Sequence, residues 1–552
     1  MYKLFRVGQG GGFMSIGKEM VNGGLVYYIP NIIIQVATII LTQQKGSEDQ
    51  FILPPAADGI ASAQALRITR SLWRSGQKQR YQIEDPTSLT VTGYKEGSLS
   101  DPKVPSVGFW SIPYFGSWIA GIKFMRNPVR LVQEGMGRAK NGLLLVATLS
   151  DEFVLVTTKE KVAEYMKAPD SVLNMQDGAN DAQQIPFTMG YGVAYRTYHN
   201  VVVRKQITPN LSQFTADMVE EVSVSFQDLI GSPRDWKPIP LYQIIAMTVA
   251  RVSNKIFVGG DFYRNAEYLQ NATDYAQAVV LSAEVLRLFP HWAKRYLVKF
   301  LPVTKCMRKA MKFLGPMVQD RIDGKYPDGK KPEDLIQWLI DAAPPIEKTA
   351  YQLVERVMAL NVASIHTTTM TFTAAIYSLA AEPAKYMDTL RAEVIQNLVD
   401  GRLTHETIQN LVYIDSFLRE SARFNVAGLA ALQRHARQSF TFSDGTIIPA
   451  GAKVAFEGFR FVQERDGKPA LEKTVVTTGT DFHLFGHGRH PCPGRFFAVH
   501  EMKIMFAILV LHYDIELAPG TKPKETYIAT MAIPDTGLNV LFRSRVKYFD
   551  LI

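Results

Sequence analysis

Hydrophobic side chains recur at helical spacing through most of the chain after residue 115. In residues 213–230 they fall at Phe214, Met218, Val222 and Phe226, one at every fourth position. This spacing places all four side chains on one face of an α-helix. Because similar spacing dominates the rest of the chain, we expect a mainly α fold whose helices pack through apolar faces.

Three further segments predict long helices. Residues 351–381 contain little charge and neither proline nor glycine, and they are too long for a strand, so we expect a buried helix that ends before Pro383. Residues 404–423 predict a helix that begins after Thr404. Residues 495–512 predict an apolar helix.

A smaller β region is expected after these central helices. Residues 440–442, 446–448 and 454–456 are short alternating stretches typical of strands, and residues 443–445 form the turn between two of them. The pattern therefore predicts a mainly α protein with a minor β part.

The first hundred residues carry a different pattern. Residues 20–44 contain no charged side chain, and the apolar stretch at 25–41 is long enough for a transmembrane helix, although a buried or surface-lying segment also fits. Residues 60–83 carry basic but no acidic side chains, which suits either an anionic membrane surface or a solvated segment. We expect an N-terminal extension over residues 1–100, with a candidate anchor near 25–41 and a proline-rich linker after it, and one large domain over 101–552.

The composition limits the kinds of partner and of functional site that the chain can have. The chain has 61 Lys and Arg and 52 Asp and Glu residues, a net charge of +9, which favours an acidic protein, anionic lipid or nucleic acid without distinguishing them. Its two cysteines are Cys306 and Cys492. This number excludes a disulfide scaffold, a multi-cysteine zinc module and an iron–sulfur cluster. A functional cysteine in this chain must therefore act alone.

Cys492 lies in the most informative segment. Residues 485–494 read Phe-Gly-His-Gly-Arg-His-Pro-Cys-Pro-Gly, a loop that directly precedes the predicted helix at 495–512. Backbone N–H groups and the helix dipole at such a position stabilise a thiolate, and glycines allow the backbone to approach a flat ligand closely. The alternative is a buried, unreactive thiol.

This loop resembles the haem-binding loop of the cytochrome P450 family, through Phe485, Gly488, His490, Cys492 and Gly494. The resemblance implies a mainly α, P450-like helical fold with a minor β region. It implies that Cys492 is the axial thiolate ligand of the iron of haem b and that Phe485 packs near the sulfur. His490 takes the place of the usual arginine near a haem propionate, a departure that matters because histidine need not be charged at neutral pH.

Four arginines and one glutamate extend the resemblance. Glu420 and Arg423 stand three residues apart on a predicted helix, and with Arg460 they resemble the family's structural network behind the haem loop. Arg434 resembles the family's propionate ligand in the β region, and Arg204 resembles an earlier propionate ligand in the chain.

Residues 363–368 resemble the family's oxygen-binding helix. Thr367 falls on the family's threonine, which implies a catalytic hydroxyl beside bound dioxygen; the alternative is a threonine bonded to its own helix backbone. His366 replaces the usual acid and is a candidate proton relay, and Ser364 replaces a glycine. The apolar stretch after Arg423 provides three candidate substrate contacts, Val426, Leu429 and Ala430.

The resemblance implies that residues 101–552 form a haem-thiolate monooxygenase domain. Such an enzyme inserts one atom of dioxygen into a small apolar organic substrate, using electrons from NADPH through an NADPH–cytochrome reductase, and needs no nucleic acid partner. The motifs look most like those of fungal members in specialised metabolism. We expect association with the endoplasmic reticulum membrane, with the catalytic domain facing the cytoplasm. The alternatives are a haem-thiolate isomerase or dehydratase and a non-catalytic membrane protein that binds haem or another ligand.

Overall fold

The computed structural model describes residues 104–107, 116–148, 152–260, 262–326, 329–425, 428–457, 473–479, 482–528 and 530–545. The candidate anchor at 25–41, the boundary near residue 100, Arg460 and Val426 lie outside these residues, so those expectations stay predictions. Among the described residues, no helix combines the length and the apolarity needed to cross a bilayer.

The chain divides into two compact units. The larger unit comprises Ser98–Val107, Met125–Val146 and Ser150–Ile552. The smaller unit comprises the remaining residues up to Leu149. Every site residue predicted from the sequence belongs to the larger unit.

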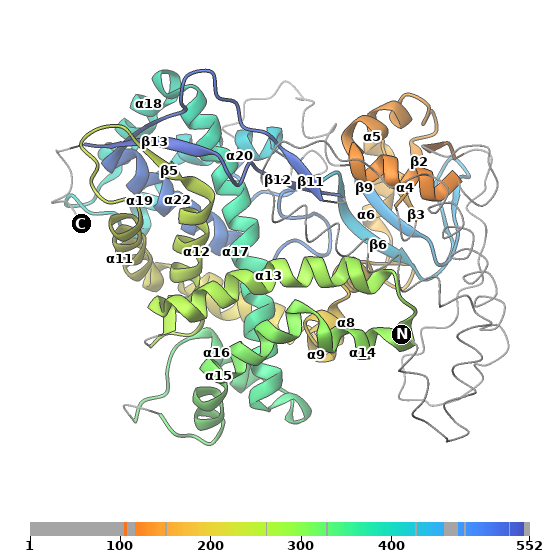
Figure 1. Ribbon diagram of the computed structural model, residues 1–552, viewed down its shortest axis with the longest axis horizontal. Coiled ribbons are helices and arrows are strands. Elements are labelled where there is room, and N and C mark those ends of the chain that lie inside the picture. Colours follow the sequence, from red (N-terminus) through yellow and green to blue (C-terminus); the bar gives the residue numbers. More distant parts are fainter. Residues whose placement is uncertain are drawn as a thin grey trace, which may run out of the picture. The chain divides into compact units, whose positions relative to one another are not determined.

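Helices make up most of the described residues, so the prediction of a mainly α fold is confirmed (Figure 1). The first nine are α4 (Gly116–Arg126), α5 (Pro128–Met136), α6 (Lys159–Lys167), α7 (Met175–Gln183), α8 (Ile185–Thr188), α9 (Tyr191–Tyr195), α10 (Tyr198–Val202), α11 (Leu211–Leu229) and α12 (Leu241–Phe257). The others are α13 (Ala266–Arg287), α14 (His291–Leu297), α15 (Pro302–Ile322), α16 (Leu335–Ala342), α17 (Ala350–Ala381), α18 (Pro383–Asn397), α19 (His405–Asn410), α20 (Val412–Phe424) and α22 (Arg495–His512).

The strands are short. They are β1 (Ser106–Val107), β2 (Leu143–Ala147), β3 (Glu152–Val156), β4 (Leu173–Asn174), β5 (Lys237–Pro240), β6 (Ala430–Ala436), β7 (Phe440–Thr441), β8 (Ile447–Ile448), β9 (Lys453–Glu457), β10 (Tyr513–Glu516), β11 (Thr526–Ile528), β12 (Met531–Ile533) and β13 (Asn539–Ser544). The predicted strands at 440–442, 446–448 and 454–456 correspond to β7, β8 and β9, and β7 and β8 pair as a hairpin.

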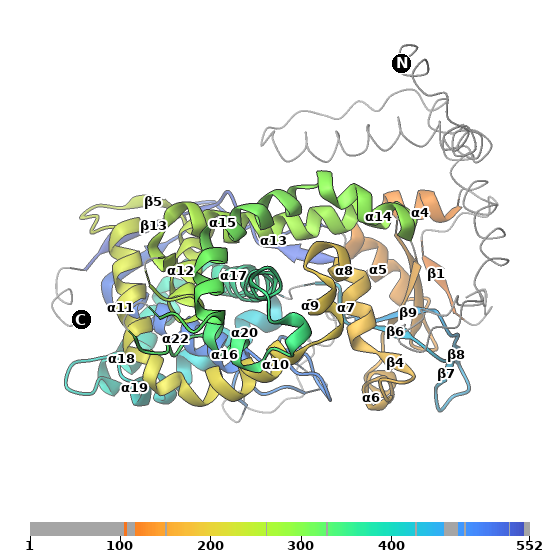
Figure 2. The ribbon, with the colours of Figure 1, turned by 90° about the horizontal axis from the view of Figure 1, so that it is seen from below.

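Helix α17 is the central element of the larger unit. Its N-cap is Thr349, whose hydroxyl accepts the N–H of Gln352 at 3.4 Å, and it ends before Pro383 as predicted. Figure 2 looks along its axis, with α13 and α15 on one side and α20 and α22 on the other. A helix surrounded in this way must be apolar on most faces, which explains the weakly charged sequence of 351–381.

Aromatic side chains join α17 to α20 and α22. The ring of Phe372 on α17 meets that of Phe506 on α22 edge-on, with centroids 6.1 Å apart. Phe417 on α20 packs against the same Phe506 ring at 5.5 Å. Each fully buried phenylalanine contributes about 1.5–3 kcal/mol through the hydrophobic effect. This packing fixes α22, and with it the cysteine loop that leads into the helix.

A six-stranded sheet forms beside the helices, with the order β1-β2-β3-β9-β6-β4 in the described residues. Strand β6 carries a bulge: Ala431 pairs with Phe456 and Arg434 with Val454, so one extra residue of β6 lies between these two pairs. Leu432 within the bulge has a left-handed backbone, with φ of 52°. Because of the extra residue, Ala431 and Arg434 lie on the same face of the sheet.

The single helix predicted over 404–423 is wrong in one respect, because the structure contains two helices that meet at Leu411. The predicted start is confirmed, since the hydroxyl of Thr404 accepts the N–H of Thr407 at 3.2 Å. The second helix begins where the buried carboxylate of Glu393 on α18 accepts the N–H of Ile414 at 2.9 Å. The start of the second helix thus depends on a cap from another helix, and local periodicity cannot reveal such a cap.

Candidate functional site

The cysteine loop is closed by one backbone hydrogen bond. The N–H of Cys492 donates to the carbonyl of Phe485 at 2.8 Å. Gly486 adopts φ of 72°, and a Cβ at this position would lie 3.2 Å from the carbonyl oxygen of His490, so a larger residue would strain the turn. Helix α22 begins at Arg495, as the sequence predicts. The loop therefore holds Cys492 immediately before a helix N-terminus.

Opposing influences act on the Cys492 thiol. Burial raises its pKa, whereas the backbone N–H groups of Gly494 and Arg495 and the positive charge of Arg495 lower it. The Arg495 side chain also donates to the Cys492 carbonyl at 3.0 Å, which keeps the guanidinium next to the loop. The loop thus presents to the sulfur the donors that stabilise a thiolate ligand.

Arg434 lies close to this loop and is almost fully buried, with 2% of its surface exposed. Its guanidinium donates to the carbonyls of Ala168 at 3.4 Å and Leu173 at 3.3 Å, and among the described residues it forms no ion pair with a carboxylate. Met166 links it to the loop, with its sulfur 3.8 Å from the guanidinium and its methyl 3.0 Å from the Cβ position of Gly488. A buried cation with neutral partners is suited to an anionic ligand.

His490 has a partner that the sequence did not indicate. Its Nε2 lies 2.8 Å and 2.9 Å from the two carboxylate oxygens of Asp170. The propionate contact expected of His490 stays a prediction and would have to use Nδ1. Asp170 follows α6 and carries no motif, so only the folded chain brings it to the loop.

Two residues in the middle of α17 have exposed side chains although their neighbours are buried or half-buried. They are Ala363 and Thr367, which lie one turn apart on one face. The Thr367 hydroxyl donates to the Ala363 carbonyl at 2.5 Å. Because this bond uses the hydroxyl hydrogen, the lone pairs of the oxygen remain able to accept a bond on the uncovered face.

His366 points towards other helices. Its Nδ1 lies 3.1 Å from the Tyr242 hydroxyl on α12, and its Nε2 lies 3.0 Å from the Thr273 carbonyl on α13. Burial lowers the pKa of its imidazole, which favours the neutral ring. Both ring nitrogens are therefore engaged away from Thr367, and the relay role of His366 stays a prediction.

The expected ion pair between Glu420 and Arg423 is present. One carboxylate oxygen accepts from Nε at 3.1 Å and from Nη2 at 2.9 Å of Arg423. Arg204 lies in a π-helical turn over Val203–Ile207, with an exposed side chain whose Nε donates to the Asn200 carbonyl at 3.4 Å. Its neighbour Val203 lies 3.9 Å from the Cβ position of Gly494, which places this turn beside the cysteine loop.

Two of the predicted substrate contacts are described. Leu429 is buried and donates its N–H to the Thr530 carbonyl at 2.8 Å. Ala430 begins β6 and is half-buried. Their contact with a substrate stays a prediction.

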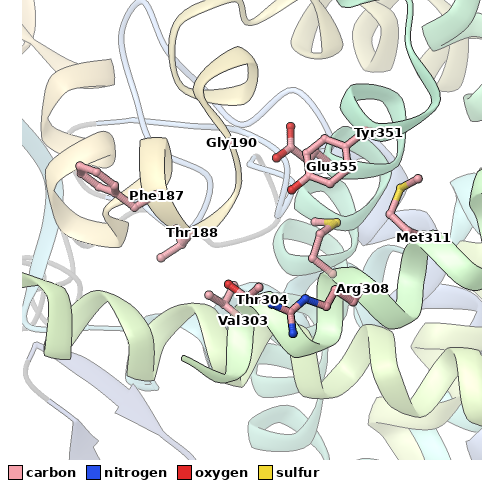
Figure 3. A pocket seen from close by; sticks show the side chains of 10 residues that line it. Phe187, Thr188, Gly190, Val303, Thr304, Arg308, Met311, Tyr351 and Glu355 are labelled. Carbon is pink, nitrogen blue, oxygen red and sulfur yellow. The ribbon is translucent and has the colours of Figure 1, made fainter. Parts of the chain in front are cut away.

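A pocket of about 330 Å³ opens between α15, the α8–α9 segment and the first turns of α17 (Figure 3). Its walls combine methionine, valine and phenylalanine side chains with a few polar groups, among them Tyr351, Glu355 and Arg308. Burial raises the pKa of the Glu355 carboxyl to about 7. Tyr351 and Glu355 lie four residues apart, one turn of α17, and both line the pocket. Glu355 and Thr367 are separated by twelve residues, a rotation of about 120° around the helix axis, and Ala359 between them is buried, so the pocket lies on a different face of α17 from Thr367.

Beside this pocket lies a buried charged cluster that sequence motifs did not reveal. Glu347 and Arg356 form an ion pair with 0% and 1% of their side-chain surfaces exposed. Arg196 donates to the same carboxylate at 2.7 Å, and Nδ1 of His199 lies 2.7 Å from the Arg356 guanidinium. Burial lowers the pKa of His199 to about 4, so this imidazole is neutral. The cluster ties α10 to the N-terminal half of α17.

Comparisons with known proteins agree with this geometry. A family model for cytochrome P450 matches residues 108–542. Cytochrome P450 monooxygenase 151 of Postia placenta is 33% identical over 81% of this chain and 95% of its own length. An ent-kaurene oxidase of Gibberella intermedia is 30% identical over 81% of this chain and 89% of its own.

The fold is also similar to that of a solved structure. Retinoic acid-bound cyanobacterial CYP120A1 superposes with a TM-score of 0.61 at 16% identity, covering 80% of this chain and 99% of its own. The family model spans well over half of the sequence, and the cysteine loop, the buried arginine and the uncovered face of α17 occupy its matched part. The chain therefore belongs to the cytochrome P450 family.

Proposed function

We propose that the protein is a haem-thiolate monooxygenase that inserts one atom of dioxygen into an apolar small molecule and releases the other as water. The observation that carries this proposal is the closed loop that holds Cys492 before α22, with two backbone N–H groups directed at its sulfur. The family and the fold imply haem with an axial cysteine thiolate. When bound, this cofactor supplies the activation of dioxygen.

The chain's own residues would hold the cofactor. Cys492 would provide the axial thiolate, and Phe485 closes the loop through its carbonyl. Arg434 offers a buried guanidinium to a propionate, with Arg204 and His490 as further proposed contacts. This donor set fits an anionic, flat ligand, because one cation is already desolvated and the loop backbone can approach closely.

Thr367 and His366 are the proposed catalytic residues. The Thr367 oxygen can accept a hydrogen bond on the uncovered face of α17 and so order a proton-donating water there. His366 would act as a proton relay only if its ring exchanged one of its two present partners.

The proposed substrate is a small apolar molecule. Leu429 and Ala430 are the proposed apolar contacts. The Gibberella relative is named an ent-kaurene oxidase, and the Postia and Gibberella relatives are both fungal, which supports a role in fungal specialised metabolism.

The partners follow from the reaction. Each turnover needs two electrons, which we propose come from NADPH through an NADPH–cytochrome reductase. We further propose that residues 25–41 hold the protein at the endoplasmic reticulum membrane with the catalytic domain facing the cytoplasm.

The test is expression of the full chain with a fungal reductase, followed by mass spectrometry of candidate apolar substrates. Monooxygenation predicts NADPH-dependent products that are one oxygen atom heavier and that carry ¹⁸O from labelled dioxygen. An isomerase or dehydratase would instead convert an organic peroxide without reductase. A haem-loaded protein that does neither across the substrate panel would favour the non-catalytic binder and contradict the proposal.

A further inference from the structure

The pocket of Figure 3 carries a guanidinium that has no partner among the described residues. Arg308 on α15 lines the pocket and, within that part of the chain, forms neither a hydrogen bond nor an ion pair. Glu355 on α17 supplies the carboxyl of the same pocket from a different wall (Figure 3). The N–H donors of Arg308 are therefore available to a ligand.

The α15 face around Arg308 is strongly positive. Lys305 precedes Arg308 by three residues and Lys312 follows it by four, so the three side chains are neighbours on the helix surface. Residues 288–319 contain seven lysine and arginine side chains and neither aspartate nor glutamate. Like charges at this spacing repel one another, and neither lysine pairs with a carboxylate of a described residue. An anion bound at Arg308 would reduce this repulsion.

The carboxyl of Glu355 is covered on one side by backbone. Gly190, which precedes α9, has φ of 106°, and a Cβ at this position would lie 2.6 Å from the Glu355 Oε2. Burial raises the pKa of Glu355 to about 7, although a hydrogen bond with Tyr351 lowers it. At neutral pH the group is therefore a mixture of the neutral acid and the carboxylate.

The charged and ionisable neighbours of Glu355 come from three elements. Arg356 on α17 lowers the pKa of Glu355, and Glu347 before α17 raises it, so these two charges oppose each other. Tyr275 on α13 stays protonated because burial raises its pKa. On α15 the charged side chain that lines the pocket is Arg308. Neutral Glu355 can donate a hydrogen bond to an anion held at Arg308, whereas ionised Glu355 would repel the anion.

Apolar side chains provide room for the body of a ligand. Phe187, Val303, Met307 and Met311 line the pocket together with these polar groups. Methionine side chains are flexible and polarisable, so they adapt to ligands of different shape. The volume of about 330 Å³ is at the lower end of the range of small-molecule sites.

We propose that this pocket is a second ligand site, which binds a small carboxylate with an apolar body through the Arg308 guanidinium. The site goes beyond the proposed monooxygenase function, because Thr367 lies on a different face of α17 from the pocket. Glu355 tunes the site: its neutral form donates to the bound carboxylate, and its ionised form opposes binding.

This arrangement links binding to proton uptake. A bound anion favours the neutral form of Glu355 and so raises its pKa further. The protein should therefore take up protons from the buffer when the ligand binds near pH 7. Affinity should be highest below the pKa of the empty site, about 7, and should fall as the pH rises above it.

The experiment is titration calorimetry on the full-length, haem-loaded protein, with the haem absorption spectrum recorded in parallel. The probes are octanoate, octanol and octylamine, which share one chain and differ in charge. Arg308→Gln removes the charge and Arg308→Lys keeps it, while Glu355→Gln removes the titration. Lys312→Gln is the matched control, because Lys312 belongs to the same positive face and does not line the pocket.

We expect octanoate to bind more tightly than octanol or octylamine, without a change in the haem spectrum. Arg308→Gln should weaken octanoate binding by about tenfold or more, the scale of a lost charged hydrogen bond, and Arg308→Lys should weaken it less. Affinity in the wild type should fall by about threefold or more between pH 6 and pH 8.5. Glu355→Gln should remove this pH dependence and the proton uptake, and Lys312→Gln should bind octanoate as the wild type does.

Four results would overturn the inference. Tighter binding of octylamine, with affinity rising with pH, would identify a cation site. An equal loss in Lys312→Gln and Arg308→Gln would show attraction to a charged surface. An Arg308-dependent change in the haem spectrum would make the pocket part of the substrate cavity. Octanoate affinity that is unchanged in Arg308→Gln would leave the guanidinium without a role. All these titrations omit reductase and NADPH, so their outcome does not depend on whether the protein forms an oxygenated product.

Discussion

The carboxylate of Glu347 and the guanidinium of Arg356 form an ion pair from which solvent is almost completely excluded. Arg356 lies in the second turn of α17, and Glu347 lies in the turn that precedes this helix. The pair therefore fixes the start of the helix that carries Ala363 and Thr367. Its neighbour His199 adds a contact to α10, the helix that leads towards Arg204.

Breaking this pair should cost much more than breaking a surface pair. In Glu347→Ala the Arg356 charge would stay buried without its carboxylate, which typically costs about 3–5 kcal/mol of unfolding free energy. The control is Glu134→Ala, because Glu134 pairs with Arg130 on the surface and such pairs contribute about 0–1 kcal/mol. Urea unfolding of the haem-loaded variants measures both, and equal losses would contradict the role of burial.

Replacing Cys492 should abolish thiolate ligation. In Cys492→Ala the reduced protein treated with carbon monoxide should lack the absorption band of a thiolate-ligated haem, because no other cysteine lies in the loop. Cys306→Ala, on α15, should keep the band. A normal band in Cys492→Ala would refute the axial assignment.

Thr367→Ala should uncouple electron transfer from product formation. The change removes an oxygen from the uncovered face of α17 and leaves the cysteine loop intact, so haem content and the spectrum should barely change. More NADPH should end as peroxide, with product per NADPH lower by about tenfold or more. Thr367→Ser, which keeps the hydroxyl, should retain most of the coupling. If both variants form as much product per NADPH as the wild type, the Thr367 hydroxyl only bonds to the backbone of its own helix.

Glu355→Gln should change the pH dependence of stability. The folded-state pKa of about 7 lies above the ordinary value of 4.5, so the Glu355 contribution to stability is complete below pH 4.5 and is lost as the pH rises through 7. Glutamine does not titrate, so the variant should match the wild type near pH 4.5 and be more stable by about 1–2 kcal/mol at pH 8, after allowance for partial solvent screening.

The measurement for Glu355 is the difference in unfolding free energy between variant and wild type at several pH values. Glu333→Gln, at an exposed position, is the control for removing a surface carboxyl. A difference that stayed constant for Glu355→Gln would mean that its carboxyl is not perturbed.

The long helices could be predicted because their sequence signals are local. The sequence predicts helices over residues 351–381 and 495–512, and α17 and α22 span Ala350–Ala381 and Arg495–His512. The cysteine loop could be predicted for the same reason, because its glycine, proline and cysteine residues all lie within ten consecutive positions. Such features depend on residues that are close together in the sequence, so the sequence alone is enough to predict them.

Features made by distant residues could not be predicted. The break at Leu411 depends on Glu393, which belongs to another helix. The partner of His490 is Asp170, which lies 320 residues earlier. In the sequence, Ser364 is recognisable only as a substitution for the family's glycine, and its contact with Ser253 exists only because α12 and α17 pack together. Periodicity shows which face of a helix is apolar, but it does not show which polar side chains of two different helices will contact each other.

Because of the bulge in β6, the number of residues in this strand affects the environment of Arg434 as much as their identity does. A strand turns alternate side chains to opposite faces, so a regular β6 would place Ala431 and Arg434 on opposite faces. The extra residue between them reverses this outcome, and the guanidinium becomes buried near the cysteine loop. The number of residues between these two strand pairs thus decides which face of the sheet Arg434 occupies. Two relatives with identical motifs but different spacing here would carry the same arginine in two different environments, and a gap in their alignment would be as informative as a substitution.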